Sequence, residues 1–485
     1  MRLGGMSSDS YSERFLKAVV IIGSSSLISM ILGVIVSKFR AIILGPSGLG
    51  IISISSGFIG VVSTLSLFGM DVLIVQDNNQ TVNYKRALNI VTIWFIMILL
   101  VLATLYIVDK RALFQFNGLN PIDWFLLTLA AFLSSLATLQ VAITSRQRNL
   151  KQLANQGMFS ALGASCVSVL IILVMREKGI VLSIVLGTLC NLLVVYLVGN
   201  SRNLWSKHSP HEKRKNIGRE LTDGAILTTT RFVEAGVQWL IPILVAYNYG
   251  VTTTGFFQCA IIISTTYLGL LNNVMSQEFF PSITQMPISN IDKIEERCNE
   301  QQLFITLISV PVILIVLGFS PYGINVIFSS AFLPAVTILK WQLVADILKF
   351  ASWSYGYLIL AKASRGYYAA THLTWSFSYL FAAIVFPRFL GLEGYGIAIL
   401  FAFLVHYLMV VIVVYLKFKA RVTLNNSIIL ALCVVYSAFM ALVVDDKRVS
   451  LANSLLSISG AFITILFLVL NNKTRKRFFS LVYRR

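Results

Sequence analysis

Long apolar runs separated by short polar segments dominate the chain. A helix that crosses the hydrocarbon core of a bilayer needs about 20 mostly apolar residues. Fourteen runs reach or approach that length, in chain order Phe15–Val36, Ile51–Val75, Leu88–Val108, Trp124–Thr144, Met158–Met175, Ile180–Val198, Ile226–Ala246, Phe256–Met275, Leu303–Phe319, Val336–Leu360, Leu373–Phe386, Ile397–Leu416, Ile428–Val444 and Leu455–Leu470. The pattern therefore predicts an all-α polytopic membrane protein with about 14 transmembrane helices.

The positions of the basic residues predict how these spans are oriented. With the N-terminus in the cytoplasm, 27 of the 39 Lys and Arg residues fall in cytoplasmic segments and nine in outer loops. The other three, Arg231, Lys340 and Lys349, lie within or at the edge of spans. Because cytoplasmic loops of membrane proteins are enriched in Lys and Arg, the distribution predicts that both termini are cytoplasmic.

Composition agrees with the pattern and limits the kinds of function. Of the 485 residues, 57% are hydrophobic and only 12% are charged, so the spans leave no room for a sizeable soluble domain. The net charge of +19 sits mostly in the short loops, where membrane topology explains it better than nucleic-acid binding does. The five cysteines and four histidines show no metal-ligand spacing, and no catalytic motif is present. We expect no cofactor, no metal and no enzymatic activity.

A glycine-rich turn recurs along the chain. LGPSGLG (Leu44–Gly50) follows the first span, and LGLEGYG (Leu390–Gly396) precedes the twelfth. Gly250 and Gly255, after the seventh span, repeat the separation of the first and last glycines of the first copy. Glycine-rich turns are common between spans, but recurrence at equivalent places favours a duplicated helical unit. We interpret Gly45, Gly48, Gly50, Gly250 and Gly255 as candidate gate turns.

The repeat predicts a division of the chain into lobes. Residues 1–199 would form an N-terminal six-helix lobe and residues 223–421 a C-terminal six-helix lobe, joined by a basic cytoplasmic linker at 200–222. Residues 422–485 would add two further transmembrane helices and a basic cytoplasmic tail.

Two charged pairs lie near span ends. Lys38 and Arg40 close the first span, where a basic side chain can reach the outer interface or, if the helix continues, face a cavity. Arg231 and Glu234 share a helical face in the seventh span and can pair. This pair is either structural or, because a desolvated carboxylate can titrate, a place where Glu234 couples transport to an ion.

One polar stripe runs along the tenth span. Gln342, Asp346, Lys349 and Trp353 recur at i, i+4, i+7 and i+11, which places them on one helical face. Asp346 can pair with Lys349 or serve in ion coupling. The stripe is either a polar clamp between helices or the wall of a cavity, and we favour the wall because Trp353 adds an aromatic face suited to sugar or lipid.

The runs FLPAVTILKWQLVADILKFASWSYGYLILAKAS and SKFRAIILGPSGLGIIS resemble Wzx-type polysaccharide flippases of the O-antigen and common-antigen type. These belong to the multidrug/oligosaccharidyl-lipid/polysaccharide exporter superfamily. The match includes Lys38 before the glycine turn and Trp341, Gln342, Asp346 and Lys349 in the tenth span. The two additional C-terminal spans depart from the most similar members, although fourteen spans occur elsewhere in the superfamily.

The resemblance implies a V-shaped, two-lobed transporter in the bacterial inner membrane. It would move an undecaprenyl-diphosphate-linked oligosaccharide of O-antigen, common-antigen or capsule type to the periplasmic leaflet by alternating access. A polysaccharide polymerase and a chain-length regulator would be its partners. Lys38 and Lys349 would contact the diphosphate and Gln342 and Trp353 the sugar, while Asp346 would position Lys349; Arg40 and Arg231 are further candidate substrate contacts.

Three alternatives stay open at this point. A multidrug extruder of the same superfamily would carry cations, which the basic residues at membrane depth disfavour. A flippase for the lipid-linked cell-wall precursor would share the fold. A membrane-embedded polymerase or ligase usually needs a large outer loop, and every predicted outer loop is short.

Overall fold

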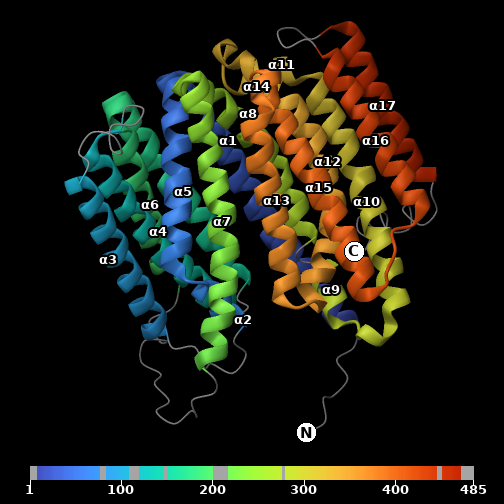
Figure 1. The fold of residues 1–485 in the computed structure, drawn as a ribbon, viewed down its shortest axis with the longest axis horizontal. Coiled ribbons are helices and arrows are strands. Elements are labelled where there is room, and N and C mark those ends of the chain that lie inside the picture. The colour runs from blue at the N-terminus through green and yellow to red at the C-terminus, as the bar shows by residue number, and fades with distance from the viewer. Residues whose placement is uncertain are drawn as a thin grey trace. The chain divides into compact units, whose positions relative to one another are not determined.

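Helices make up almost all of the described part of the chain in the computed structural model (Figure 1). The structure describes residues 8–76, 84–108, 119–146, 150–199, 217–275, 279–444 and 450–470. The helices are α1 Ser8–Leu67, α2 Met70–Gln76, α3 Tyr84–Val108, α4 Pro121–Arg146, α5 Leu150–Met175, α6 Ile180–Val198, α7 Ile217–Tyr249, α8 Val251–Val274, α9 Phe280–Gln285, α10 Ile291–Gly318, α11 Ser320–Ile327, α12 Val336–Lys362, α13 Arg365–Val385, α14 Pro387–Leu390, α15 Glu393–Phe418, α16 Leu424–Val443 and α17 Leu451–Leu470.

The all-helical membrane fold predicted from the sequence is confirmed. Within the described residues, nine segments are long and apolar enough to cross a membrane. Two of them, Met30–Leu67 and Lys151–Val198, each overlap two predicted spans. Two shorter apolar helices, Val251–Thr266 and Asn453–Phe467, fall on the eighth and fourteenth predicted spans. The count of fourteen stays a prediction.

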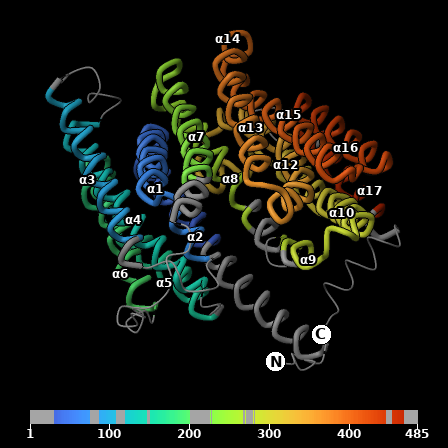
Figure 2. The backbone as a smooth tube through the Cα atoms, turned by 60° about the horizontal axis from the view of Figure 1, so that its bottom comes forward, coloured from blue at the N-terminus to red at the C-terminus, as the bar shows by residue number. Residues whose placement is uncertain are grey.

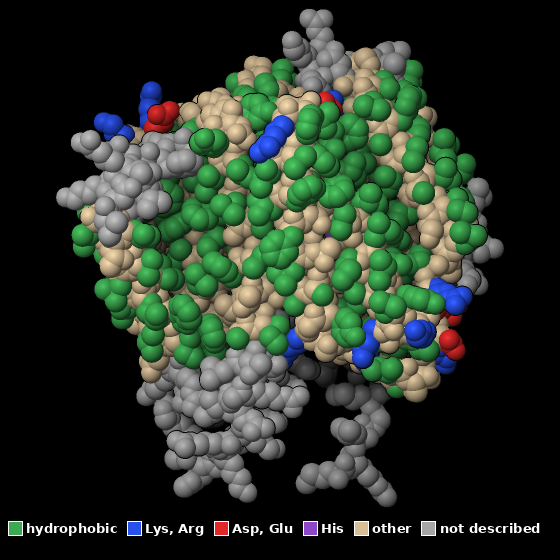
Figure 3. Space-filling view, viewed as in Figure 1, with side chains coloured by type: hydrophobic (Ala, Val, Ile, Leu, Met, Phe, Trp, Pro, Cys, Tyr) green, Lys and Arg blue, Asp and Glu red, His purple; other side chains and the backbone are tan. Residues whose placement is uncertain are grey.

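Surface composition agrees with a membrane environment. On the face shown in Figure 3, hydrophobic side chains cover the middle of the helices, and Lys and Arg side chains lie towards their ends. Such an apolar belt suits the hydrocarbon core, where exposed charge is costly.

The second predicted span, Ile51–Val75, is wrong beyond Leu67. There the helix α1 ends in a turn in which Phe68 and Gly69 have φ values of 44° and 69°, and the short helix α2 follows. Positive φ values are incompatible with a continuous right-handed helix. The apolar pattern runs on through the turn because α2 is itself packed inside the protein.

Helix α1 is broken a second time, at the first glycine turn. The helix continues past Lys38 and Arg40 to Gly45, which has φ 64° and ψ −170° and is followed by Pro46. Gly250 and Gly391, the equivalent first glycines of the other two turns, also have positive φ, 85° and 59°. The same left-handed backbone at three equivalent places supports the interpretation of a repeated unit.

Gly45→Ala is expected to destabilise the protein by about 1–3 kcal/mol, because only glycine tolerates this backbone conformation. Gly60→Ala is a matched control, since Gly60 is helical and a Cβ added at either glycine meets nothing within 4 Å. We expect Gly60→Ala to be neutral or stabilising. The midpoint of thermal unfolding in detergent measures both, and equal effects would contradict a role for the left-handed turn.

The chain forms two compact units, Met1–Trp239 and Leu240–Arg485, which divide within α7. Most of the predicted linker at 200–222 and most of the predicted basic tail lie outside the described residues. The predicted division into two six-helix lobes and an additional C-terminal pair therefore stays a prediction.

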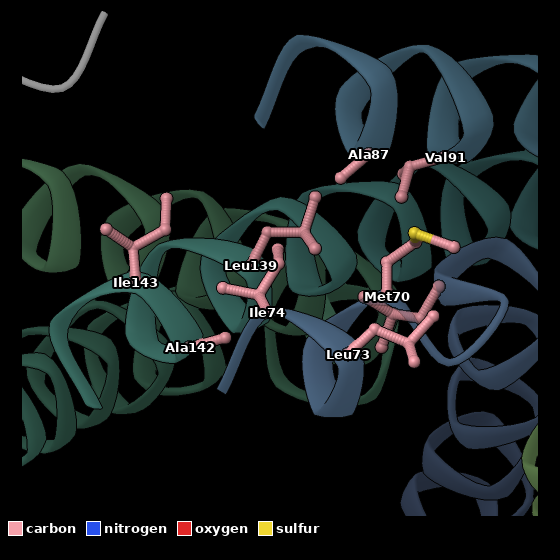
Figure 4. Packing of buried hydrophobic residues seen from close by; sticks show 9 residues of the cluster. Met70, Leu73, Ile74, Ala87, Val91, Leu139, Ala142 and Ile143 are labelled. Atoms are coloured by element: carbon pink, nitrogen blue, oxygen red, sulfur yellow. The ribbon is translucent and has the colours of Figure 1, made fainter. Parts of the chain in front are cut away.

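In the first unit, α1 packs on α3, α4 and α5, and α6 packs on α4 and α5. The short helix α2 packs on α4, and Figure 4 shows its buried side chains beside those of α3 and α4. Met70, Leu73 and Ile74 of α2 pack with Val91 of α3 and Leu139 of α4 in one buried apolar cluster. This cluster fixes the end of α1 after its turn.

In the second unit, α12 is the central helix, in contact with α8, α10, α13, α15 and α16. Its neighbours α13 and α15 also pack on each other, and the three helices lie side by side in Figure 2. Helix α17 packs along α10, where Ser457 lies against Gly318.

A buried polar network joins α10 to the segment that leads into α16. Asn299 donates from its Nδ2 to the carbonyl of Arg421 (2.9 Å) and accepts at its Oδ1 from the Thr423 amide (2.8 Å). The Tyr355 hydroxyl of α12 donates to the same Oδ1 (2.9 Å), and Asn426 Nδ2 donates to the Asn299 carbonyl (2.7 Å). Asn299 is only 6% exposed, so this network attaches the start of α16 to α10 and α12 away from solvent.

Candidate functional site

The candidate site is built on α12, whose residues are buried on almost every side. A helix that is surrounded by other helices can keep polar residues only where they find partners or meet water. These residues of α12 lie in three places: Lys340 and Trp341 near its start, Gln342 and Asp346 further along, and Lys349 and Trp353 from its middle onward.

At the start of α12, one carboxylate serves two donors. Glu393, from the third glycine turn, lies 3.2 Å from Lys340 Nζ and also accepts a short hydrogen bond from Trp341 Nε1. Gly396 allows the close approach, since a Cβ there would lie 2.7 Å from the carbonyl oxygen of Ile338. Through Glu393 and Gly396, the glycine turn therefore holds α15 against α12 as well as connecting two helices.

Glu393→Ala is expected to destabilise the protein by about 2 kcal/mol, because it removes the acceptor that Lys340 and Trp341 share. Breaking a fully buried ion pair costs about 3–5 kcal/mol, and the 33% exposure of Glu393 reduces the effect. Glu177→Ala, at an exposed carboxylate, is the control and should change stability little. Equal midpoints of thermal unfolding for both variants would contradict a stabilising role of the contacts that Glu393 makes with Lys340 and Trp341.

The next part of the stripe is closed to solvent. Asp346 is 1% exposed and accepts a hydrogen bond of 2.7 Å from Ser264 Oγ of α8. Gln342 is 6% exposed, and its Oε1 has no hydrogen-bond partner among the described residues. Only Lys349 and Trp353 of the predicted stripe are partly exposed in this structure.

Lys349 is the central residue of the 27-residue helix α12. Its ammonium lies 5.2 Å from the centroid of the Phe403 ring of α15, within the range of a cation–π contact. Trp353 packs edge-on against Phe350 with ring centroids 5.1 Å apart. A partly exposed ammonium so far from both ends of a spanning helix is favourable only where it meets protein or water rather than lipid.

Further aromatic and imidazole rings from α13 and α15 lie next to the Phe403 ring, one after another. Trp375 lies 5.6 Å from Phe403, and His406 lies 6.3 Å from the same ring. His372 of α13 lies 5.9 Å from His406, and Tyr368 lies 4.2 Å from His372. We call Lys349, Phe403, Trp375, His372 and His406 the α12–α13–α15 cluster.

In the first unit, the two basic residues before the first glycine turn differ in environment. Lys38 is exposed, whereas Arg40 is half-buried and donates from Nη2 to Ser168 Oγ of α5 (2.8 Å). The Arg40 Nε is buried without a hydrogen-bond partner among the described residues. The glycines that follow pack closely, since a Cβ on Gly48 would lie 2.4 Å from Leu44 Cβ. Gly50 is buried, and in the second unit so is its counterpart Gly255.

Arg231 forms an ion pair that sequence spacing did not indicate. Its Nη1 lies 2.8 Å from Asp71 Oδ2 of α2, with side-chain exposures of 41% and 18%. Glu234, the neighbour predicted to pair with Arg231, lies one turn further along α7 and is partly buried. An ion pair this exposed stabilises weakly, by about 1 kcal/mol or less.

The sequence did not indicate the histidine pair or the Glu393 clamp, since their members are far apart along the chain. One signal was available: in the described part of the chain, His372 and His406 are the only histidines, and both lie in apolar helices. No group of three or more His, Cys, Asp or Glu side chains in the described part could hold a metal ion.

Comparison with known proteins adds to this geometry. The family model described as "Polysaccharide biosynthesis protein" matches residues 41–337. None of the curated proteins compared with the chain matches it.

Solved structures share the fold at low sequence identity. The lipid II flippase MurJ in an inward closed conformation has a TM-score of 0.65 at 12% identity, covering 93% of this chain and 99% of that one. An inward-facing multidrug resistance transporter of the MATE family, from the MOP superfamily, has a TM-score of 0.54 at 14% identity over 84% and 98%. The MATE multidrug transporter DinF-BH gives the same TM-score and identity over 86% and 97%.

Proposed function

The chain belongs to the polysaccharide biosynthesis protein family, and from this we propose that it is a flippase for lipid-linked oligosaccharides. It would move undecaprenyl-diphosphate-linked repeat units from the cytoplasmic to the periplasmic leaflet by alternating access. The repeat unit would be of O-antigen, common-antigen or capsule type. The chain would be a multi-pass protein of the bacterial inner membrane with both termini in the cytoplasm, working beside a polymerase and a chain-length regulator.

The observation that carries this proposal is Lys349, a partly exposed residue at the centre of α12. A cation at that depth offers a binding partner to an anionic headgroup that must cross the apolar core. A diphosphate has oxygens for several donors, and hydrogen bonds between charged groups are among the strong ones. The fold shared with a lipid II flippase is compatible with a cargo of this kind.

The other proposed roles follow the same chemistry. Lys38 and Lys349 are proposed diphosphate contacts, and Trp353 and Gln342 proposed sugar contacts. Asp346, buried against Ser264, is a proposed ion-coupling residue together with Glu234.

The proposal is tested by deleting the gene in its native host and restoring it from a plasmid. We expect the deletion to remove the surface glycan and to trap undecaprenyl-linked repeat units on the cytoplasmic leaflet. The trapped sugar identifies the substrate.

Other results of the same experiment would point elsewhere. An intact surface glycan with raised sensitivity to cationic drugs would replace the proposal with a multidrug extruder, whose fold the chain also shares. Accumulation of the cell-wall precursor instead would keep the reaction and change the substrate.

A further inference from the structure

The histidines of the α12–α13–α15 cluster form a group that the proposed function does not use. Two of the chain's four histidines, His208 and His211, lie outside the described residues. The other two come together from α13 and α15, with ring centroids 5.9 Å apart at an interplanar angle of 68°. Histidine is the side chain whose charge ordinarily changes near neutral pH, so a pair inside apolar helices calls for a role.

The geometry around His406 fixes which of its nitrogens is basic. The Nδ1 lies 3.2 Å from the carbonyl oxygen of Thr371. A carbonyl only accepts, so Nδ1 carries the hydrogen, and the neutral ring takes up its second proton at Nε2. A proton there produces a cation beside the Phe403 ring, which already supports the Lys349 ammonium at 5.2 Å.

Aromatic rings border the imidazoles. The His372 ring lies with its centroid 4.2 Å from that of Tyr368, at an interplanar angle of 39°. The cluster also offers a neutral donor, because Trp375 Nε1 is buried with no hydrogen-bond partner among the described residues.

The titratable groups on the three helices can be placed from their contacts. Lys349 from α12 and Tyr368 and Tyr379 from α13 belong to the cluster or touch it. Arg365 is the first residue of α13, seven residues before His372. The other groups have contacts of their own: Asp346 with Ser264, Tyr355 with Asn299 and Gln302, Tyr357 with Phe280, Lys362 with Thr284, Tyr395 with Asn248, Tyr407 with Gln302, Tyr415 with Lys419, Lys417 with Tyr367, and Lys340 with Glu393. The contacts described for the cluster thus bring together basic and aromatic groups.

We propose that Lys349, His372 and His406 form a diphosphate-binding site that strengthens when the two imidazoles take up protons. This rests on the proposed function and adds the histidine pair to its substrate contacts. All three side chains are partly exposed, so a ligand can reach them. The Lys349 ammonium and the protonated imidazoles would each donate to the diphosphate oxygens.

Linkage gives the direction of the effect. If a diphosphate binds the protonated site more tightly, its binding also promotes proton uptake by the same factor. Affinity therefore rises as the pH falls through the titration of the histidines. A flippase with this site would take up protons as it takes up its headgroup.

The test measures binding of undecaprenyl diphosphate to the full chain in lipid nanodiscs at pH 7.5 and pH 5.5. The wild type is expected to bind about tenfold more tightly at the lower pH, within the usual range for coupled sites. The double variant His372→Gln, His406→Gln should bind more weakly than the wild type at pH 5.5, and its affinity should change less than about twofold between the two pH values. Any pH effect that remains in this double variant measures the titration of the ligand itself.

The matched control is His208→Gln, His211→Gln, which alters the other two histidines and should keep the full pH effect. If the double histidine variant of the cluster does not fold, the single variants His372→Gln and His406→Gln are measured, each with an expected partial loss. A full pH effect in the cluster variants would overturn the site.

Two further outcomes separate this inference from the function on which it rests. If the wild type binds undecaprenyl diphosphate at neither pH, both the proposed substrate and this site fail. If it binds but the histidines do not matter, only the site fails. If inorganic pyrophosphate competes with undecaprenyl diphosphate and shows the same pH dependence, the site recognises the diphosphate alone. If it does not compete, the site also requires the lipid.

Discussion

Replacing Lys349 with alanine is expected to abolish the surface glycan while the protein stays in the membrane in normal amount. The ammonium is partly exposed, and the contact described for it is the Phe403 ring, so the fold does not depend on it. A hydrogen bond between charged groups contributes about 1.5–3 kcal/mol, which corresponds to roughly a 10- to 100-fold loss of headgroup affinity. Glycan on the cell surface and protein in the membrane fraction are the two measurements.

Lys362→Ala is the matched control for this experiment. Lys362 is the last residue of the same helix, and its ammonium donates to the Thr284 carbonyl at 2.7 Å. Lys362→Ala removes the same type of side chain at the end of the span, so we expect a nearly normal amount of surface glycan. Normal glycan from Lys349→Ala at normal expression would remove Lys349 from the site. Equal loss from both variants would show that net charge, rather than position, matters.

Asn299→Ala is expected to lower the free energy of unfolding by on the order of 3 kcal/mol, because each buried polar group left without a partner costs about 1–3 kcal/mol. The change removes the acceptor of the Thr423 amide and a donor to the Arg421 carbonyl. Tyr355 keeps a second acceptor, Gln302 Oε1 at 3.1 Å, which limits the loss. The midpoint of thermal unfolding in detergent measures the effect.

Asn325→Ala, at an exposed position of α11, makes the same chemical change without touching a buried network. It should shift the midpoint only slightly, as surface substitutions do. Because α16 follows directly on this network, protease cleavage between α15 and α16 should accelerate in Asn299→Ala and not in the control. A wild-type midpoint for Asn299→Ala would mean that apolar packing alone holds α16.

Several features of the fold could be predicted because they depend on local sequence. A run such as Val336–Leu360 is apolar over the length of a bilayer and has one stable backbone conformation there, the helix. The positive φ values of Gly45, Gly250 and Gly391 occur where the glycine-rich turns recur. The break at Phe68–Gly69 could not be predicted in the same way, because hydropathy does not distinguish a spanning helix from a short helix buried in the protein.

The candidate site was likewise predictable only in the part that depends on local sequence. Spacing along the helix placed Lys349 on one face of α12 with Gln342, Asp346 and Trp353, since the period of a helix is known from the sequence. It could not show that Asp346 would be buried against Ser264 while Lys349 would lie over Phe403. Both contacts depend on which neighbour each part of α12 meets.

The sequence by itself determined that this chain is a helical membrane protein with repeated glycine turns and a few basic residues within its apolar helices. These properties follow from hydrophobicity and backbone preference, which act residue by residue. Only the tertiary structure decided the partners: Asp71 for Arg231, Ser168 for Arg40, Glu393 for Lys340 and the pairing of the two histidines. Apolar helices pack together through shape, and a sequence of Leu, Ile, Val and Phe carries little information about which helix faces which.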